Sequence, residues 1–175
     1  MTTGKRVRRS SALRVVLLFA MLAGALTAFS SVGTPAFASS YSIMLKNHAT
    51  GDCLTRSEKS TVTSVYALPC SDSPNQRWIV EQCTTLFCGT VRIVNAVDQR
   101  CVTGAGPEHK TFIGLYQCSS IGSRDVWLPY SSSEKDAFLF MSSFYSKQCL
   151  EQSGTNTFLV PCTASDSQFW EIAHP

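Results

Sequence analysis

The stretch Cys70-Ser-Asp-Ser-Pro-Asn-Gln-Arg-Trp78 decides the fold of this 175-residue chain, because versions of it occur three times. Cys162-Thr-Ala-Ser-Asp-Ser-Gln-Phe-Trp170 keeps the Cys-to-Trp spacing of 8 residues, and Cys118-Ser-Ser-Ile-Gly-Ser-Arg-Asp-Val-Trp127 is one residue longer. Another cysteine precedes each copy, at a constant interval of 48 residues: Cys53, Cys101 and Cys149. A fixed period of this size indicates a repeated structural unit. Three copies predict a closed threefold object rather than an open array.

These residues resemble the ricin-type lectin family, whose fold is a β-trefoil. That family carries Gln-x-Trp near the end of each repeat, behind a Cys-Leu near its start. Gln76-Arg-Trp78 and Gln168-Phe-Trp170 match in full, whereas Asp125-Val-Trp127 has Asp in place of Gln. The resemblance implies an all-β chain, with a β-trefoil of three repeats at about 41–83, 88–131 and 135–175.

The first 38 residues have the composition of an export signal. Five basic residues precede an apolar run over 15–29, and the segment ends in Ala36-Phe-Ala38. This pattern predicts a signal peptide over 1–38, cleavage before Ser39 and a secreted, extracellular domain over 39–175. A membrane-spanning signal anchor is the alternative, because the apolar run approaches the lower length limit for a span. Arg8-Arg9 hints at twin-arginine export, but we favour the general route.

The charge balance changes when the leader is removed. The leader carries 5 of the 15 Lys and Arg and none of the 12 Asp and Glu, so the mature chain has a formal charge of −2. Without a basic cluster to neutralise phosphates, we expect no nucleic acid partner. We also expect no membrane span after signal removal.

All 8 cysteines lie after the leader. An even number in an exported chain predicts disulfides rather than metal ligands, although sequence alone leaves about 105 pairings open. Because equivalent cysteines in the repeats should have equivalent partners, we predict three pairs within repeats, and a fourth that closes a hairpin tip between repeats one and two. These pairs are Cys53–Cys70, Cys101–Cys118, Cys149–Cys162 and Cys83–Cys88. We expect no metal and no cofactor.

Strand patterns fill the repeats, and no segment has a helical period. Tyr41, Ile43 and Leu45 alternate with small or polar residues, as in a half-buried strand. We expect about four short strands per repeat, with each motif Trp at the end of one of them. The Trp side chains should fill the core, and Gln76 and Gln168 should bond backbone groups left open by turns.

The family resemblance also implies where a sugar would bind. Sugar-binding members have an acidic residue after Cys-Leu, an aromatic residue two places before the second cysteine and an Asn near Gln-x-Trp. Repeat one has Thr55 and Leu68 at the first two positions, but keeps Asn75. Tyr66 could replace the missing aromatic residue only if its side chain faces the same way as Leu68.

Repeats two and three also depart from that pattern. Repeat two has Thr103 for the acid but Tyr116 in the aromatic place, with Arg124 and Asp125 near the Trp. Repeat three has the acid, Glu151, but Val160 in the aromatic place. We therefore rank repeat two first and predict that Tyr116→Ala abolishes sugar retention without unfolding the chain. An exposed tyrosine without a binding role is the alternative.

Two functional classes remain. The first is a secreted carbohydrate-binding module, without catalytic activity, whose partner is a glycan or polysaccharide. The second is a protein-binding trefoil scaffold, such as a toxin-accessory or inhibitor-like subunit. We do not expect an enzyme, because the chain has no recognised nucleophile or metalloprotease motif. A carboxylate pair for glycoside hydrolysis stays open, since sequence does not place these residues in space: Asp52, Asp98, Glu108 and Asp125.

Overall fold

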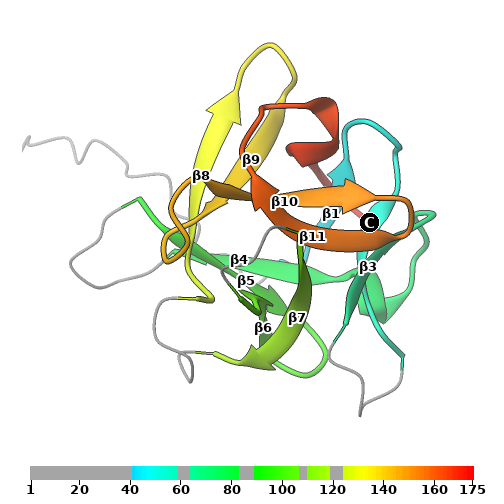
Figure 1. Ribbon diagram of the computed structural model, residues 1–175. Helices are drawn as coiled ribbons and strands as arrows, with labels where there is room; N and C mark the ends of the chain where they lie inside the picture. Colours follow the sequence, from blue (N-terminus) through cyan, green and yellow to red (C-terminus); the bar gives the residue numbers. More distant parts are fainter. Residues whose placement is uncertain (1–40, 59–63, 83–88, 107–109, 119–123) are drawn as a thin grey trace, which may run out of the picture. The chain divides into compact units, whose positions relative to one another are not determined.

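The computed structural model describes residues 41–58, 64–82, 89–106, 110–118 and 124–175. Strands dominate this part of the chain, and two short 3₁₀ turns, η1 (Pro74–Gln76) and η2 (Asp166–Gln168), lie within it (Figure 1). The twelve strands are β1 (Met44–Asn47), β2 (Cys53–Arg56), β3 (Val65–Leu68), β4 (Trp78–Gln82), β5 (Val91–Asn95), β6 (Arg100–Gly104), β7 (Thr111–Gln117), β8 (Trp127–Ser132), β9 (Ala137–Ser142), β10 (Gln148–Ser153), β11 (Asn156–Pro161) and β12 (Phe169–Ala173).

Six of the strands close into a barrel. Antiparallel pairs join β12 to β1, β4 to β5, β5 to β8, β8 to β9 and β9 to β12. A bridge between Ile43 and Trp78 links the start of β1 to β4 and completes the ring. Closure removes the unpaired strand edges that an open sheet would expose. The prediction of a closed threefold all-β object is confirmed.

The other six strands form three hairpins, β2–β3, β6–β7 and β10–β11. Each hairpin also pairs with its neighbours, through Asn156 with Tyr66, Phe158 with Phe112 and Ser64 with Gly114. These contacts recur once per repeat, so the three hairpins form a triangular cap. A barrel capped in this way is the β-trefoil that the sequence predicts.

The three motif tryptophans lie at the centre of the core. Trp78, Trp127 and Trp170 are fully buried. Each indole N–H donates to the carbonyl oxygen of the residue after the first cysteine of its repeat: Leu54 at 2.8 Å, Val102 at 3.0 Å and Leu150 at 3.2 Å. Each buried Trp therefore has its polar atom satisfied, as burial in an apolar core requires.

One expectation about these residues is wrong. Each Trp was expected at the end of a strand, but Trp78 and Trp127 are the first residues of β4 and β8. Trp170 is the second residue of β12. Arg77 separates the end of η1 from β4, and η2 ends directly before β12, so the Gln-x-Trp segment leads from a turn into a strand.

Three predicted disulfides are confirmed: Cys53–Cys70, Cys101–Cys118 and Cys149–Cys162. Their Cα–Cα distances of 4.9, 5.0 and 5.0 Å agree, which shows that the three bonds tie equivalent points of the repeats. Cys83 and Cys88 lie outside the described residues. Within the described ranges, no helix is long and apolar enough to cross a membrane.

Candidate functional site

The glutamines of the motif hold the turns beside the hairpins of repeats one and three. The Gln76 side chain accepts from the Ser71 N–H at 2.7 Å and donates to the Pro69 carbonyl at 3.0 Å. Gln168 makes the equivalent bonds to the Thr163 N–H at 2.8 Å and the Pro161 carbonyl at 2.9 Å. In both repeats the glutamine therefore positions the chain between the second cysteine and the Trp.

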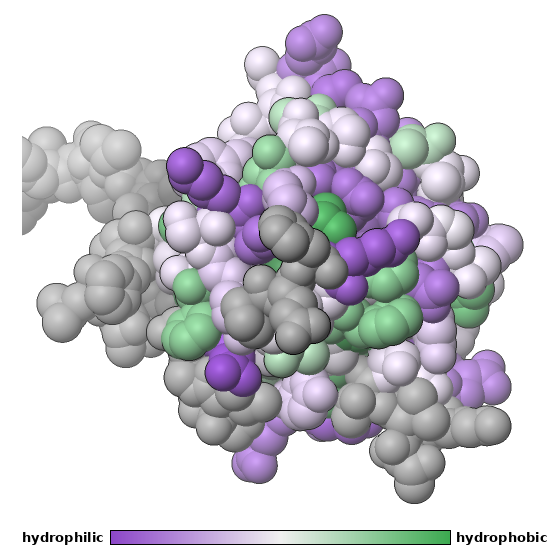
Figure 2. Space-filling view, viewed as in Figure 1, coloured by the Kyte–Doolittle hydropathy of each residue, from purple (hydrophilic) through white to green (hydrophobic). Residues whose placement is uncertain are grey.

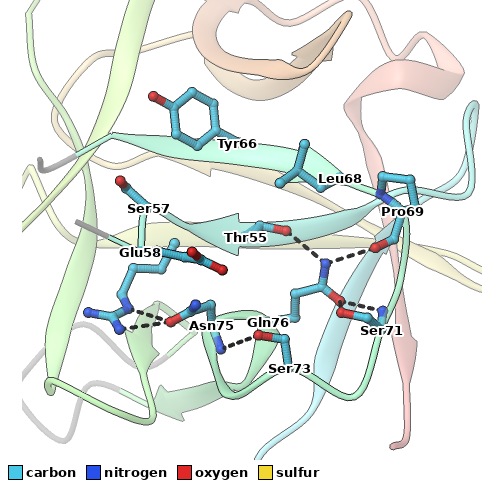
Figure 3. Close-up of a pocket in the computed structure, with 11 residues that line it drawn as sticks. Thr55, Ser57, Glu58, Tyr66, Leu68, Pro69, Ser71, Ser73, Asn75 and Gln76 are labelled. Atoms are coloured by element: carbon cyan, nitrogen blue, oxygen red, sulfur yellow. Dashed lines mark hydrogen bonds between the residues drawn. The ribbon is translucent and has the colours of Figure 1, made fainter. Parts of the chain in front are cut away.

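A pocket of about 290 Å³ opens beside this turn in repeat one (Figure 3). It lies over β2, β3 and η1, and most of its lining residues are polar. Its lining residues are Thr55, Arg56, Ser57, Glu58, Tyr66, Leu68, Pro69, Ser71, Ser73, Asn75 and Gln76. Three of the predicted contact residues of repeat one, namely Thr55, Tyr66 and Asn75, meet in this pocket.

Tyr66 meets the condition set from the sequence. Val65 and Ala67 are buried, whereas Tyr66 is half-buried and Leu68 is exposed. Because side chains alternate along a strand, Tyr66 and Leu68 share the outer face of β3. Figure 3 shows both side chains projecting from the same side of this strand. The pocket thus has an aromatic ring and an aliphatic side chain along one wall.

The family's acidic position is occupied by a hydroxyl that already has two partners. The Thr55 Oγ1 donates to the Cys53 carbonyl at 2.7 Å and accepts from the Gln76 Nε2 at 3.0 Å. Only 6% of Thr55 is exposed. A carboxylate reaches the same pocket from Glu58, which is exposed. Glu58 is therefore the carboxylate that lines the repeat-one pocket.

An ion-pair network fixes the lower side of the pocket. The Arg56 guanidinium donates to the Asn75 Oδ1 from Nε at 3.1 Å and from Nη2 at 2.7 Å. It also donates from Nη1 to the Asp98 Oδ2 at 3.0 Å. Figure 3 shows the Asn75 Oδ1 held by Arg56, and among the pocket residues drawn there the amide Nδ2–H₂ of Asn75 is left to donate.

Repeat two contributes the carboxylate that holds this network. The Arg100 side chain donates to the Asp98 Oδ2 from Nε at 2.9 Å and from Nη2 at 2.6 Å. Burial would raise the pKa of Asp98, but the hydrogen bonds and charge of Arg100, with the charge of Arg56, hold that pKa below its ordinary value. The site of repeat one is therefore completed by a turn of the next repeat.

Within the described part of the chain, the predicted residues of repeat two have separate contacts. Thr103 is 1% exposed and donates to the Cys101 carbonyl at 2.9 Å. Asp125 is buried and accepts from Arg92 Nε at 3.0 Å. Arg124 lies over the ring of Phe144, with 5.3 Å between Cζ and the ring centroid. Tyr116 is half-buried on the outer face of β7.

Repeat three places its acid at the family's position. The Glu151 Oε2 accepts from the Gln168 Nε2 at 2.9 Å, the counterpart of the contact between Gln76 and Thr55. Val160 is half-buried on the same face of the hairpin. Among the described residues, no group of three or more His, Cys, Asp or Glu side chains is placed to hold a metal ion.

Sequence reasoning missed three residues of the repeat-one site: Arg56, Glu58 and Asp98. The first two stand in a polar run, Thr55-Arg-Ser-Glu58, directly after Cys-Leu, and this run was an available signal. Asp98 gave no such signal, because it lies 42 residues from Arg56 and only the fold brings the two together.

A comparison with family models matches residues 41–170 to the ricin-type β-trefoil lectin domain. A search of curated proteins found no match. The fold is similar to the Macrolepiota procera ricin B-like lectin in complex with lactose, with a TM-score of 0.64 and 18% identity, over 78% of this chain and 97% of that one.

Two similar structures come from other functional contexts. The cytolethal distending toxin from Actinobacillus actinomycetemcomitans has a TM-score of 0.63 and 18% identity, over 78% of this chain and 92% of that one. An exo-β-1,3-galactanase from Clostridium thermocellum has a TM-score of 0.68 and 15% identity, over 78% of this chain and 31% of that one. This chain thus spans about a third of the galactanase. Identities this low indicate a shared fold and no more.

Proposed function

The chain belongs to the ricin-type β-trefoil lectin domain family, and we propose that it is a secreted carbohydrate-binding module without catalytic activity. The observation that carries this proposal is the repeat-one pocket, in which Tyr66, Asn75 and Glu58 line one cavity. A sugar offers hydroxyl groups and an apolar C–H face, so it needs directed polar groups beside an aromatic surface. The pocket supplies both.

Each wall of the pocket has a different role in this proposal. Tyr66 presents its ring to the apolar face of a sugar, and Leu68 extends that wall. Asn75 donates through the amide group that Arg56 holds in orientation, and the Glu58 carboxylate accepts from hydroxyl groups. The pocket has both a guanidinium and a carboxylate, so neutral saccharides suit its charge balance.

The hydropathy of the face shown in Figure 2 favours a small ligand rather than a partner that binds through a broad apolar contact. Figure 2 shows a mainly hydrophilic face on which hydrophobic residues form separate patches. Large continuous apolar patches usually mark protein or membrane contacts. A hydrophilic face with small, separate apolar patches is compatible with a small polar ligand such as a saccharide.

A glycan array with the oxidised, secreted protein tests the proposal. We expect binding to one class of neutral saccharide, and the free sugar should compete for that binding. A folded, disulfide-bonded protein that retains no glycan would overturn the proposal and favour a protein partner.

Two tyrosines allow a matched test of the site. Tyr66→Ala should lower affinity about tenfold, because it removes the stacking ring from the pocket. Tyr116→Ala, in the β6–β7 hairpin, should leave binding unchanged if the binding site is in repeat one. The opposite result would restore the ranking of repeat two that the sequence favoured. Both residues are half-buried, so equal thermal stability of the variants is the control.

A protein-binding role is the second candidate. The observation that favours it is Thr55, whose buried hydroxyl replaces the family's acid and is already bonded twice. An accessory role in a toxin would not require an intact sugar site. Purification with an intact partner polypeptide, combined with silence on the glycan array, would support this role.

A further inference from the structure

The turn between β9 and β10 brings aromatic rings to repeat two, where the equivalent turns bring carboxylates to the other repeats. The third residue after the first cysteine is Arg56 in repeat one and Gln152 in repeat three. Arg56 donates to the Asp98 Oδ2 at 3.0 Å, and Gln152 donates to the Asp52 Oδ2 at 2.8 Å. Each carboxylate lies between the first two strands of the next repeat around the trefoil. These two turns therefore place a negative charge beside the neighbouring hairpin.

Repeat two has Gly104 at the equivalent position, with no side chain for a carboxylate to bind. A Cβ atom added to Gly104 would lie 3.0 Å from the Leu159 Cδ2 and 3.5 Å from the Tyr145 Cδ2. Tyr145 is only 8% exposed, whereas its neighbour Phe144 is 49% exposed. The two rings meet edge to face, with 4.8 Å between their centroids. The buried Tyr145 ring therefore supports the exposed Phe144 ring.

Arg124 lies against these two rings, and within the described residues it has no carboxylate partner. Its Cζ is 5.3 Å from the Phe144 centroid and 5.8 Å from the Tyr145 centroid. The other arginines that the structure describes all form an ion pair with an aspartate: Arg56, Arg77, Arg92 and Arg100. A guanidinium can bind a carboxylate through its edge while an aromatic ring covers its face. The half-buried Arg124 is therefore prepared to pair with an external carboxylate.

The surroundings of Arg124 suit a peptide better than a sugar. Thr103 is buried, and its hydroxyl already donates to a backbone carbonyl. Asp125 is also buried and accepts from a guanidinium. The two residues after Thr103 are glycine and alanine. A sugar needs several directed polar groups, whereas arginine and aromatic side chains are enriched in contacts between proteins.

We infer that Arg124 and Phe144 form a docking site for an acidic segment of a protein partner. A carboxylate of that segment pairs with the Arg124 guanidinium, and an apolar side chain beside it packs on the exposed Phe144 ring. Lys147 is exposed in the same turn and adds a positive charge, so the site is complementary to an acidic partner. This inference goes beyond carbohydrate binding, because none of these residues lines the repeat-one pocket.

Nitrogen-15 NMR titration of the oxidised protein at low salt tests the inference with a defined peptide. The probe is acetyl-Gly-Glu-Leu-Glu-Leu-Gly-amide, and its matched control has Gln in place of both Glu residues. We expect the acidic peptide to shift the amide signals of Phe144 and Tyr145 and the Nε signal of Arg124. The neutral peptide should shift them much less. Added salt should weaken binding of the acidic peptide, because it screens the attraction between carboxylate and guanidinium.

Variants test the two side chains separately. Arg124→Gln should weaken binding of the acidic peptide about threefold to tenfold, and Arg124→Lys should restore only part of it, because an ammonium group cannot form the paired bonds. Phe144→Ala should weaken binding about threefold, because the apolar side chain loses its contact. Two matched controls should bind as wild type does. Arg77→Gln removes the same charge from repeat one, and Tyr130→Ala removes a ring of similar exposure, 51%.

The outcomes decide between this inference and its alternatives. Equal shifts with the Glu and Gln peptides, or wild-type affinity in Arg124→Gln, overturn the docking site. Methyl glucuronide tests a saccharide as the source of the carboxylate. If it shifts the Arg124 and Phe144 signals and the acidic peptide does not, the site binds an acidic saccharide and the inference is wrong. The signals of Thr55 and Asn75 should not respond to the peptides, so the proposed function is tested independently by the glycan array.

Discussion

Repeats one and three have the same internal frame and different outer faces. In both repeats, the Trp N–H reaches the carbonyl of the residue after the first cysteine, at 2.8 Å from Trp78 and 3.2 Å from Trp170. In both, the glutamine bonds the turn that follows the second cysteine. On the outer face, however, the partner of the glutamine is a threonine in repeat one and a glutamate in repeat three.

This difference shows which positions the fold constrains. Inward-facing residues must fill a shared core at close packing, so changes there cost stability. Outward-facing residues at the same register contact solvent or ligand, so they can change independently in each repeat. Binding chemistry therefore has to be read repeat by repeat, even where the fold is threefold.

Removal of an inward-facing Trp should give the largest effect. Trp78→Ala should lower the free energy of unfolding by about 3–5 kcal/mol, because it leaves a large cavity among buried side chains. Urea denaturation followed by circular dichroism measures this loss. Tyr130→Ala, at an exposed aromatic residue, should stay within about 0.5 kcal/mol of wild type. Similar losses of stability for the two variants would contradict the division between constrained inward-facing residues and variable outward-facing residues.

Disulfide removal should have a slightly smaller effect that is similar in the three repeats. The bonds close 17, 17 and 13 residues. Loop-closure entropy then predicts a loss of about 3 kcal/mol for each double Cys→Ser variant, with differences of about 0.5 kcal/mol or less. Chemical denaturation of the three variants compares them directly. A much larger loss in one repeat would show that its disulfide supports more than its own hairpin.

The frame was predictable from sequence because it depends on spacing. Cysteines 48 residues apart and a fixed Cys-to-Trp distance identify equivalent positions without any knowledge of the structure. Equivalence then predicts the three disulfides found within the repeats. The wrong placement of Trp at strand ends has a local cause. In repeats one and three the strand begins within two residues of the end of a 3₁₀ turn, and three-residue turns leave little trace in hydrophobic periodicity.

The candidate sites were harder to predict because their residues come from different repeats. Asp98 supports the repeat-one pocket from the next repeat, through its hydrogen bond with Arg56. This contact does not follow from residue spacing within one repeat. The role of Tyr66 depended on the direction of its side chain, which the sequence alone does not give. The burial pattern of β3 gives that direction.

Introduction of an acid into repeat one should convert its outer face toward that of repeat three. In Thr55→Asp, the new carboxylate can accept from Gln76 Nε2 and leave its second oxygen to a sugar. We expect affinity at the pocket to rise about threefold to tenfold, because a charge-assisted hydrogen bond is stronger than one between neutral groups. Calorimetric titration with the sugar selected on the array measures the change.

The control for this exchange is Thr55→Val, which keeps the shape of the side chain but removes its hydroxyl. Its affinity should not rise. An equal gain in both variants would show that the hydroxyl hinders binding and that the carboxylate adds nothing.

Acidification should have a smaller effect, which acts on the repeat-one pocket. The pKa of Asp98 is lowered in the folded state, so its contribution to stability is complete above the unfolded pKa, about 3.9, and is lost as pH falls through the lower folded value. Below that range, a protonated Asp98 no longer attracts Arg56, and Arg56 then holds Asn75 less firmly. Sugar binding in repeat one should weaken there. At pH 7, Asp98→Asn should bind sugar as weakly as the wild type does in acid. The unfolding free energies of the variant and the wild type should converge as pH falls. If the unfolding free energies of Asp98→Asn and wild type differ by the same amount at every pH, the Asp98 carboxylate does not support the pocket.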